Sequence, residues 1–413
     1  MSSEGDRRHR YFCHHLLTAK NMLRVRLWPL VATFAASAAV APLSAQSAPT
    51  PTALDFSGII FGSYNFQEST NGAPFNRQID NSFIVDRAYL TFRMPAGDHT
   101  SIRITTDLYQ TTEGTPNAYT IRAKYAYLQY AATKMANGAQ MTGRIGILHN
   151  VVIDHEEQFW PRYLSQTAVE RAGYFASADA GLAGLFTLPN KLGEVYATIT
   201  NGPGYTSREV DRFKDYAIRL SVTPLANNTD MPILNTFTVT AWGYKGATAS
   251  ACVPGNTACT GGFVGESIDR SRAGLFVGLR DPRLVLGAEY AQRHEGGELT
   301  PTTTRTLTEN TGHLLSAYTV VRPLAFMNET GKSPFGVVAR YDAVKPTAST
   351  NGFTTAPPTD NAYHTAIAGV FWDLSTKAQI ALDYQESLAS NNGTSSAPPA
   401  PSKAYFAHFV VNF

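Results

Sequence analysis

The feature of this sequence that most limits its fold is a side-chain alternation that recurs from residue 54 to the end of the chain. Segments of roughly ten residues alternate apolar with small or polar side chains, and stretches rich in turn-forming residues separate them. In one segment, Leu286 and Tyr290 fall on one face of an extended strand, while Glu289 and Arg293 fall on the other. We count sixteen segments, at 54–67, 82–94, 100–110, 120–132, 139–149, 180–188, 193–201, 213–224, 235–245, 270–279, 283–293, 311–322, 335–343, 362–373, 378–387 and 403–413. The pattern predicts antiparallel β structure with two unlike faces, a property that soluble sandwiches and membrane barrels share.

The gaps between the segments alternate in length, and this separates the two architectures. Short gaps lie at 95–99, 134–138, 189–192, 280–282 and 374–377. Long gaps, mostly rich in Gly, Ser, Thr, Pro and Asn, lie at 68–81, 246–269, 294–310, 344–361 and 388–402. Short turns at one rim and long loops at the other are typical of an up-and-down barrel with both chain ends on one side. We therefore expect an all-β, 16-stranded antiparallel up-and-down transmembrane β-barrel, although the turns at 225–234 and 323–334 are longer than this pattern requires.

Composition favours the same architecture. Charged residues make up 16% of the chain, below the roughly 25% of soluble domains, and aromatic residues make up 11%. Outside the N-terminal region, no stretch approaches the ~20 apolar residues that a spanning helix needs. Lipid offers no water to satisfy backbone groups, so a membrane β-sheet must close on itself. A barrel of about sixteen strands is wide enough to enclose an aqueous lumen.

The first 45 residues are typical of a leader that ends in a secretory signal peptide, with a basic start, a short apolar run and small residues before the cleavage point. We expect cleavage after Ala45, with Ser47 and Ala48 as alternatives, and translation from Met22, the alternative being a long polar leader. A short linker, 46–53, would then precede the barrel domain at 54–413. Without residues 1–45, the chain keeps 28 basic and 30 acidic residues, and the formal charge of +2 becomes −2. No surface basic enough for nucleic acid is expected.

Two of the three cysteines, Cys252 and Cys259, lie in one Gly- and Pro-containing loop of the expected mature chain. An even pair in an exported protein predicts a disulfide. A metal site is the alternative reading, but neither His nor a further Cys lies nearby in the sequence.

The last segment ends the chain at Phe413. A terminal Phe on an alternating strand resembles the assembly signal of bacterial outer-membrane barrels, the alternative being chance. With the export signal, it predicts an outer-membrane location and contact with the assembly machinery, membrane lipids and lipopolysaccharide.

The gap at 150–179, here called the third loop, differs from the other long gaps because it carries large apolar side chains. They are Phe159, Trp160, Tyr163, Leu164 and Val169. Such residues need a surface to pack against, and the interior of the barrel is the nearest one. We expect the loop to fold inward and constrict the lumen, with a lid or a subunit-contact loop as the alternatives.

Several short stretches resemble bacterial general porins, most closely the phosphate-selective porin O/P-like family. They are DRAYLTFR at 86–93, GRIGI at 143–147, ER at 170–171, NGPG at 201–204, KDYAIRL at 214–220, RYD at 340–342 and the aromatic C-terminus. The resemblance implies a sixteen-stranded trimeric channel with an inward third loop. Members of that family line the pore with many lysines, whereas only Lys124 and Lys214 fall within the expected strands here. Phosphate specificity is therefore not implied.

Charged residues of both signs are the candidate pore-lining and constriction residues. On the strands they are Arg87, Arg103, Arg144, Arg219 and Arg340, and in the third loop they are Asp154, Glu156, Glu157, Arg162, Glu170 and Arg171. Interior strand arginines either orient passing solutes or pair with nearby carboxylates and stiffen the wall. The loop charges either set a field across the lumen or are solvated. Asp154 to Glu157 lack the His-Glu-x-x-His spacing of a zinc site, so we expect neither metal nor cofactor.

The leading functional hypothesis is a non-enzymatic channel for small hydrophilic solutes and ions, with weak ion selectivity because the expected lumen is mixed in charge. An anion- or phosphate-selective channel is the first alternative. An outer-membrane barrel enzyme, a lipase or protease, is the second, but the chain lacks Gly-x-Ser-x-Gly, and neither His149 nor His155 has an evident serine partner. An energy-coupled receptor would need a plug, for which the expected mature N-terminus leaves no room. A soluble adhesin would separate from membranes on fractionation.

Overall fold

The computed structural model describes residues 54–70, 77–110, 118–209, 211–249, 267–299, 306–328, 331–346, 362–389 and 402–413. The expected leader, cleavage site and linker precede these residues. Cys252 and Cys259, with their predicted disulfide, also lie outside them.

Within these residues the chain forms sixteen β-strands. They are Asp55–Thr70 (β1), Arg77–Pro95 (β2), Thr100–Gln110 (β3), Tyr119–Ala131 (β4), Gln140–His149 (β5), Ala178–Thr187 (β6), Gly193–Thr200 (β7), Asp215–Val222 (β8), Thr238–Ala249 (β9), Ser267–Arg280 (β10), Leu284–Leu299 (β11), Thr306–Val321 (β12), Phe335–Lys345 (β13), Tyr363–Asp373 (β14), Ala378–Ala389 (β15) and Ser402–Asn412 (β16). The third loop contains two short α-helices, Ile153–Glu156 (α1) and Ala168–Arg171 (α2). No helix in the described ranges has the length and hydropathy needed to cross a bilayer.

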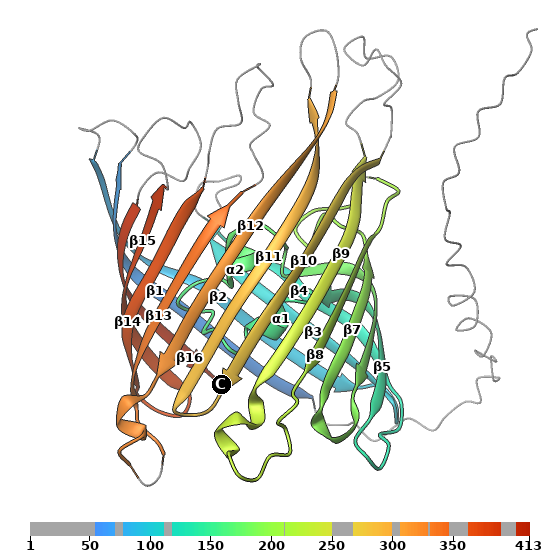
Figure 1. The fold of residues 1–413 in the computed structure, drawn as a ribbon, viewed down its shortest axis with the longest axis horizontal. Coiled ribbons are helices and arrows are strands. Elements are labelled where there is room, and N and C mark those ends of the chain that lie inside the picture. Colours follow the sequence, from blue (N-terminus) through green and yellow to red (C-terminus); the bar gives the residue numbers. More distant parts are fainter. Residues whose placement is uncertain are drawn as a thin grey trace, which may run out of the picture. The chain divides into compact units, whose positions relative to one another are not determined.

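The strands form one closed sheet (Figure 1). Each strand pairs antiparallel with its sequence neighbours, and β16 pairs with β1, which confirms the predicted 16-stranded barrel. At the closure, the Gly58 amide donates to the Phe413 carbonyl over 2.9 Å, and the Phe413 amide donates to the Gly58 carbonyl over 3.0 Å. The last residue thus completes the ladder, so that no strand edge is left unpaired at this point.

The alternation in the sequence gives the wall two faces. Apolar side chains such as Ile121, Leu275 and Leu382 are 64%, 57% and 61% exposed on the outer face. Polar side chains such as Thr105 and Ser316 are buried on the inner face. An apolar exterior with a polar interior is the arrangement that a barrel in lipid requires.

Two β-bulges interrupt this alternation, and each adds a charged residue to the interior. The residue without a partner is Asp86 in the β1–β2 pairing and Lys124 in the β3–β4 pairing. An extra residue lets two successive side chains point to one side of a sheet. Lys124 and Tyr125 are accordingly both buried, and Asp86 accepts a hydrogen bond from Ser63.

The two turns that are longer than expected contain 3-10 helices, Pro232–Thr236 (η2) and Pro323–Ala325 (η4). Each begins at a proline, whose fixed φ suits the first position of a helix. A third, Pro189–Lys191 (η1), lies in the turn between β6 and β7. The extra length of the two turns is therefore ordered local structure and adds no strand.

Candidate functional site

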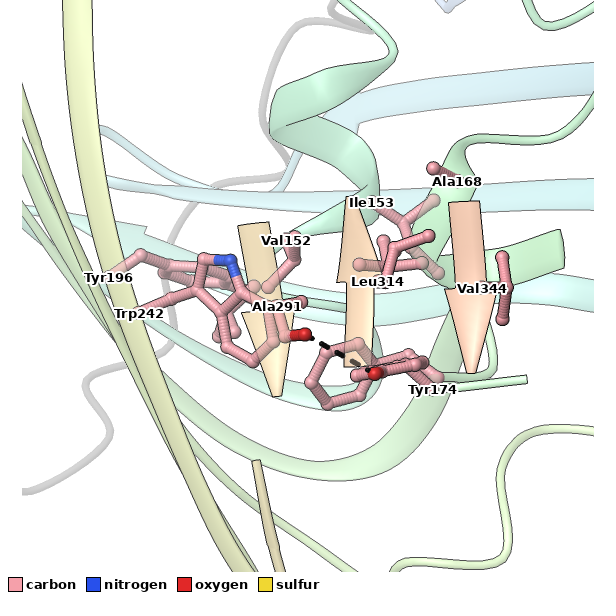
Figure 2. Close-up of a cluster of buried hydrophobic side chains, with 12 residues drawn as sticks. Val152, Ile153, Ala168, Tyr174, Tyr196, Trp242, Ala291, Leu314 and Val344 are labelled. Atoms are coloured by element: carbon pink, nitrogen blue, oxygen red, sulfur yellow. Dashed lines mark hydrogen bonds between the residues drawn. The ribbon is translucent and has the colours of Figure 1, made fainter. Parts of the chain in front are cut away.

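The third loop is packed against strands from both halves of the barrel. Figure 2 shows the largest apolar cluster, in which loop residues including Val152, Ile153 and Tyr174 meet strand residues. The strand residues are Tyr196 on β7, Trp242 on β9, Ala291 on β11, Leu314 on β12 and Val344 on β13. The Tyr174 hydroxyl also donates to the Ala291 carbonyl over 3.4 Å.

Two further clusters extend this contact. Trp160 and Leu164 pack on Val338, Ile367 and Phe371 of β13 and β14, together with Ala381 of β15. Leu148 of β5 and Ala178 of β6, on the strands that flank the loop, pack on Tyr125 and Tyr127 of β4. One segment can touch β7, β9 and β11–β15 together only from inside a closed barrel. Burial of each large apolar side chain contributes about 1.5–3 kcal/mol to the seating of the loop.

Four arginines of the strands that the loop covers bind its backbone, Arg280 and Arg293 over 3.2–3.4 Å and the other two over shorter distances. The Arg219 guanidinium donates to the Val151 carbonyl over 2.8 Å, and the Arg340 guanidinium donates to the Gln166 carbonyl over 2.6 Å. Both side chains are nearly inaccessible, at 4% and 3% exposure. Arg219 and Arg340, expected from the sequence to line the lumen, thus lie beneath the loop and bind its main chain. We call β7–β15 the covered wall.

A salt bridge also joins two parts of the loop to each other. The Arg162 guanidinium pairs with the carboxylates of both Glu157 and Glu170 and lies 2.8 Å from Glu170 Oε1. Arg162 is itself largely buried. Three of the predicted constriction residues are therefore brought together, and their charges partly neutralise one another.

The other predicted loop residues point in different directions. Asp154 is half-exposed, and its carboxylate lies 3.9 Å from His149 Nε2. Arg171 donates to Ser165 Oγ over 3.1 Å and, less closely, to side chains of β15. Glu156 is buried against the covered wall. Asp154 is thus the most accessible of these charges.

The inner face of β2–β5 carries cations that no loop carbonyl binds, and we call it the cationic wall. Arg87 and Arg122 flank the buried Asp107, at 3.1 and 3.0 Å from its Oδ2. Arg103 lies 2.9 Å from His149 Nε2, and Arg144 donates to a glutamine oxygen over 2.8 Å.

Three of these cations, Arg103, Lys124 and Arg144, form no ion pair with any carboxylate in the described part of the chain. Tyrosine rings accompany them instead, and Lys124 Nζ lies 4.1 Å from the Tyr89 ring centroid. Lys124 also lies over Tyr125, Arg103 lies over Tyr125, and Arg144 lies over Tyr127 and Tyr196. Ring faces attract cations without cancelling their charge, so the positive potential persists.

Two cavities of about 530 Å³ each lie at the rim of the short turns, on either side of β1. The charged residues lining the first are Asp55, Arg93, Arg103, Arg144 and Asp154. Those lining the second are Glu157, Arg162, Arg322, Asp373 and Lys377. Both cavities are thus mixed in charge. Sequence reasoning missed Asp86 and Lys124 as inner residues, because a bulge shifts the alternation by a single residue, too short a change to recognise in the side-chain pattern.

A serine, a histidine and an aspartate lie on adjacent strands at the closure of the barrel. His408 Nε2 lies 2.8 Å from Asp383 Oδ2, while the Ser63 hydroxyl donates to Asp86. All of Ser63, His408 and Asp383 are buried, and a nucleophilic serine must instead be accessible and bonded to its base. No three His, Cys, Asp or Glu side chains in the described ranges converge as ligands of a metal would.

The fold matches solved outer-membrane proteins. OmpF of Salmonella typhi, in complex with daunomycin, is 15% identical, with a TM-score of 0.55 over 87% of this chain and 97% of that one. DcaP, an outer membrane channel of Acinetobacter baumannii, is 10% identical, with a TM-score of 0.56 over 87% and 97%. OmpT, an outer membrane protein of Vibrio cholerae in its trimer form, is 12% identical, with a TM-score of 0.51 over 87% and 99%.

The described residues have the fold of outer-membrane porins. At these identities the likeness concerns the fold alone. No protein-family model matches the sequence, and no curated protein matches it.

Proposed function

We propose that the protein is a passive channel of a bacterial outer membrane, which admits small hydrophilic solutes and ions with weak ion preference. The observation that carries this proposal is a closed barrel with an apolar exterior, whose third loop lies inside beside cavities lined by both charge signs. A lumen of this kind needs no cofactor or energy source, because solutes move down their own gradients.

The third loop sets the size limit in this proposal. It fills the side of the lumen next to the covered wall, so solutes pass between the loop and the cationic wall. There Asp154 and the cluster of Glu157, Arg162 and Glu170 face Arg103 and Arg144 across the path, and Lys124 is buried within the cationic wall. Opposed charges across a narrow, poorly screened passage orient polar solutes and disfavour apolar ones.

A specific observation favours the anion-selective alternative. Arg103, Lys124 and Arg144 have no carboxylate partner among the described residues and carry three positive charges. Arg162 offsets one of the two carboxylates of Glu157 and Glu170, so these residues together with Asp154 leave two negative charges. The net field along the path is therefore positive. We propose a modest preference for anions and no specificity for phosphate.

The proposal extends to assembly. OmpT, which shares the fold, is known in a trimer form, and we propose a homotrimer here. Lipid and lipopolysaccharide would contact the apolar outer face. Phe413, whose backbone closes the β1–β16 ladder, would be the residue that the assembly machinery recognises.

Planar-bilayer recording of the purified protein tests both proposals. We expect ohmic channels, a small anion-favouring reversal potential in a salt gradient, and a shift toward cations in the double variant Arg103→Gln, Arg144→Gln. Lys134→Gln, on an exposed short turn, is the control and should leave the potential unchanged. Absence of conductance, together with hydrolysis of lipid or peptide, would favour the enzyme instead.

A further inference from the structure

Two carboxyl groups meet where the third loop rests on the covered wall. Glu156 comes from α1 and Glu289 from β11, and each is only 3% exposed. The two side chains are close enough to interact, and Oε1 of each is buried without a hydrogen-bond partner in the described part of the chain. Two carboxylates this close and this buried would repel each other, so one member of the pair must be protonated in this arrangement.

The nearest cations do not replace that proton, because each is already bound. Arg340 pairs with Asp342 at 2.7 Å and donates to the Gln166 carbonyl. Arg219 pairs with Glu194 and donates to the loop backbone. Both lie close enough to act on the pair electrostatically, and neither forms a hydrogen bond with it. Two negative charges here would therefore be buried without a counter-ion of their own.

The remaining groups around the pair carry no charge. Trp242 of β9 faces Glu289, and the Tyr318 hydroxyl of β12 is buried without a hydrogen-bond partner among the described residues. Burial, followed by the nearby Arg219, lowers the pKa of His155 to about 3, so this neighbour is neutral. Burial, followed by the adjacent Glu289 carboxyl, raises the pKa of Glu156 well above its usual range.

We propose that the proton shared by Glu156 and Glu289 is a latch, which holds the third loop on the covered wall, and that its loss at alkaline pH releases the loop into the lumen and closes the channel. The direction in which the released loop moves follows from its packing. The loop already contacts the covered wall, so the space on the cationic side is where a released loop can move. Measuring channel closure rests on the proposed channel function, whereas measuring the release of the loop does not.

The sign of the pH dependence follows from proton counting. A seated pair holds one proton, and released, solvated carboxyls lose theirs above a pKa of about 4.3. Each pH unit above that value therefore raises the ratio of released to seated loop by up to about tenfold, until the latch itself has lost its proton. The loop is most firmly seated in acid, and its seating weakens as the pH rises.

Two measurements on the full chain test the latch. Trp160 in the loop and Trp242 in the wall beneath it are both buried, so their combined emission reports release, and Trp372→Phe removes the exposed tryptophan on the outer face. In that background, we expect a red shift in emission between about pH 5 and pH 10. In bilayers, we expect more frequent closures over the same range.

Glu156→Gln supplies amide protons that donate to Glu289 at any pH, so both responses should become flat. Glu289→Gln should behave in the same way and is the second variant if the first does not fold. Asp269→Asn, an exposed carboxylate on β10, is the control and should respond like the parent. An unchanged response in both Gln variants, or no response in the parent, overturns the latch. A red shift that Glu156→Gln abolishes, in a protein that never conducts, supports the latch and refutes the channel.

Discussion

The covered wall and the cationic wall both present arginines to the interior of the barrel, yet they use them differently. Arg219 and Arg340 on the covered wall are buried, paired with carboxylates and bonded to loop carbonyls. Arg103 and Arg144 on the cationic wall are less buried and lie over tyrosine rings, with no carboxylate partner in the described ranges. The residue type and the strand face are the same on the two walls. What differs is whether the third loop lies on top.

This difference shows that the role of an inward-pointing charge in this barrel depends on whether the third loop covers it. Beneath the loop an arginine is a structural clamp, because its donors are used and water is excluded. Beside the lumen it acts mainly through its field. Substitutions on the covered wall should therefore change stability, and substitutions on the cationic wall should change selectivity.

The largest effect is expected for Arg340→Met. It leaves Asp342, at 2% exposure, as a buried carboxylate without its cation, and it removes the bond to Gln166. Breaking a buried pair in this way costs about 3–5 kcal/mol, measurable by denaturant unfolding in micelles. Arg93→Met is the control, because the Arg93–Asp55 pair is exposed and worth ~0–1 kcal/mol. Equal losses in the two variants would remove the distinction between the walls.

Arg162→Gln should have the largest effect on ion preference. It leaves the carboxylates of Glu157 and Glu170 without their cation on the lumen side of the loop. One unit of charge at close range in a wet passage changes the energy of an ion by about 1 kcal/mol, or about fivefold in permeability ratio. The reversal potential should move toward cations, whereas Arg340→Gln should barely move it. A comparable shift in the two variants would mean that the covered wall also faces the lumen.

The sequence was sufficient to predict the barrel, because alternation, gap lengths and closure are properties that lipid imposes on each strand separately. The strand ends were less predictable. β2 begins at Arg77, ahead of the predicted 82–94 segment, since its pairing with β1 continues as far as Thr70. Ladders that extend beyond the alternating stretch leave no signal in side-chain pattern.

The residue types that form the site could be predicted from the sequence, whereas their arrangement in space could be predicted less well. The apolar residues Trp160 and Leu164 indicated correctly that the loop packs against a surface, and both are buried. Which wall the loop lies on depends on contacts far apart in the chain, as between Gln166 and Arg340, and so the roles of the strand arginines could not be separated. The bulges at Asp86 and Lys124 depend on register, which alternation does not encode.

Two single-residue deletions also test the comparison between the walls, and their effects should be smaller than those of the substitutions above. Because Asp86 and Lys124 are the unpaired bulge residues, removing either restores regular pairing and keeps every other side chain on its face. Deletion of Lys124 removes a cation and should shift the permeability ratio toward cations by about twofold, and deletion of Asp86 should shift it the other way. Deletion of Ala126, which has a partner in both neighbouring strands, is the control and should impair folding, because it inverts one end of β4.

The smallest effect is expected for Arg171→Gln, although the sequence placed this residue in the constriction. Its guanidinium donates to Ser165 over 3.1 Å, to Gln385 over 3.4 Å and to Ser387 over 3.5 Å. These are neutral acceptors, the last two on the covered wall, so the loss should be about 0.5–1.5 kcal/mol of stability. Because the charge points into β15, the reversal potential should stay within error of the parent. A shift as large as that of Arg162→Gln would place Arg171 on the solute path and move the boundary of the covered wall.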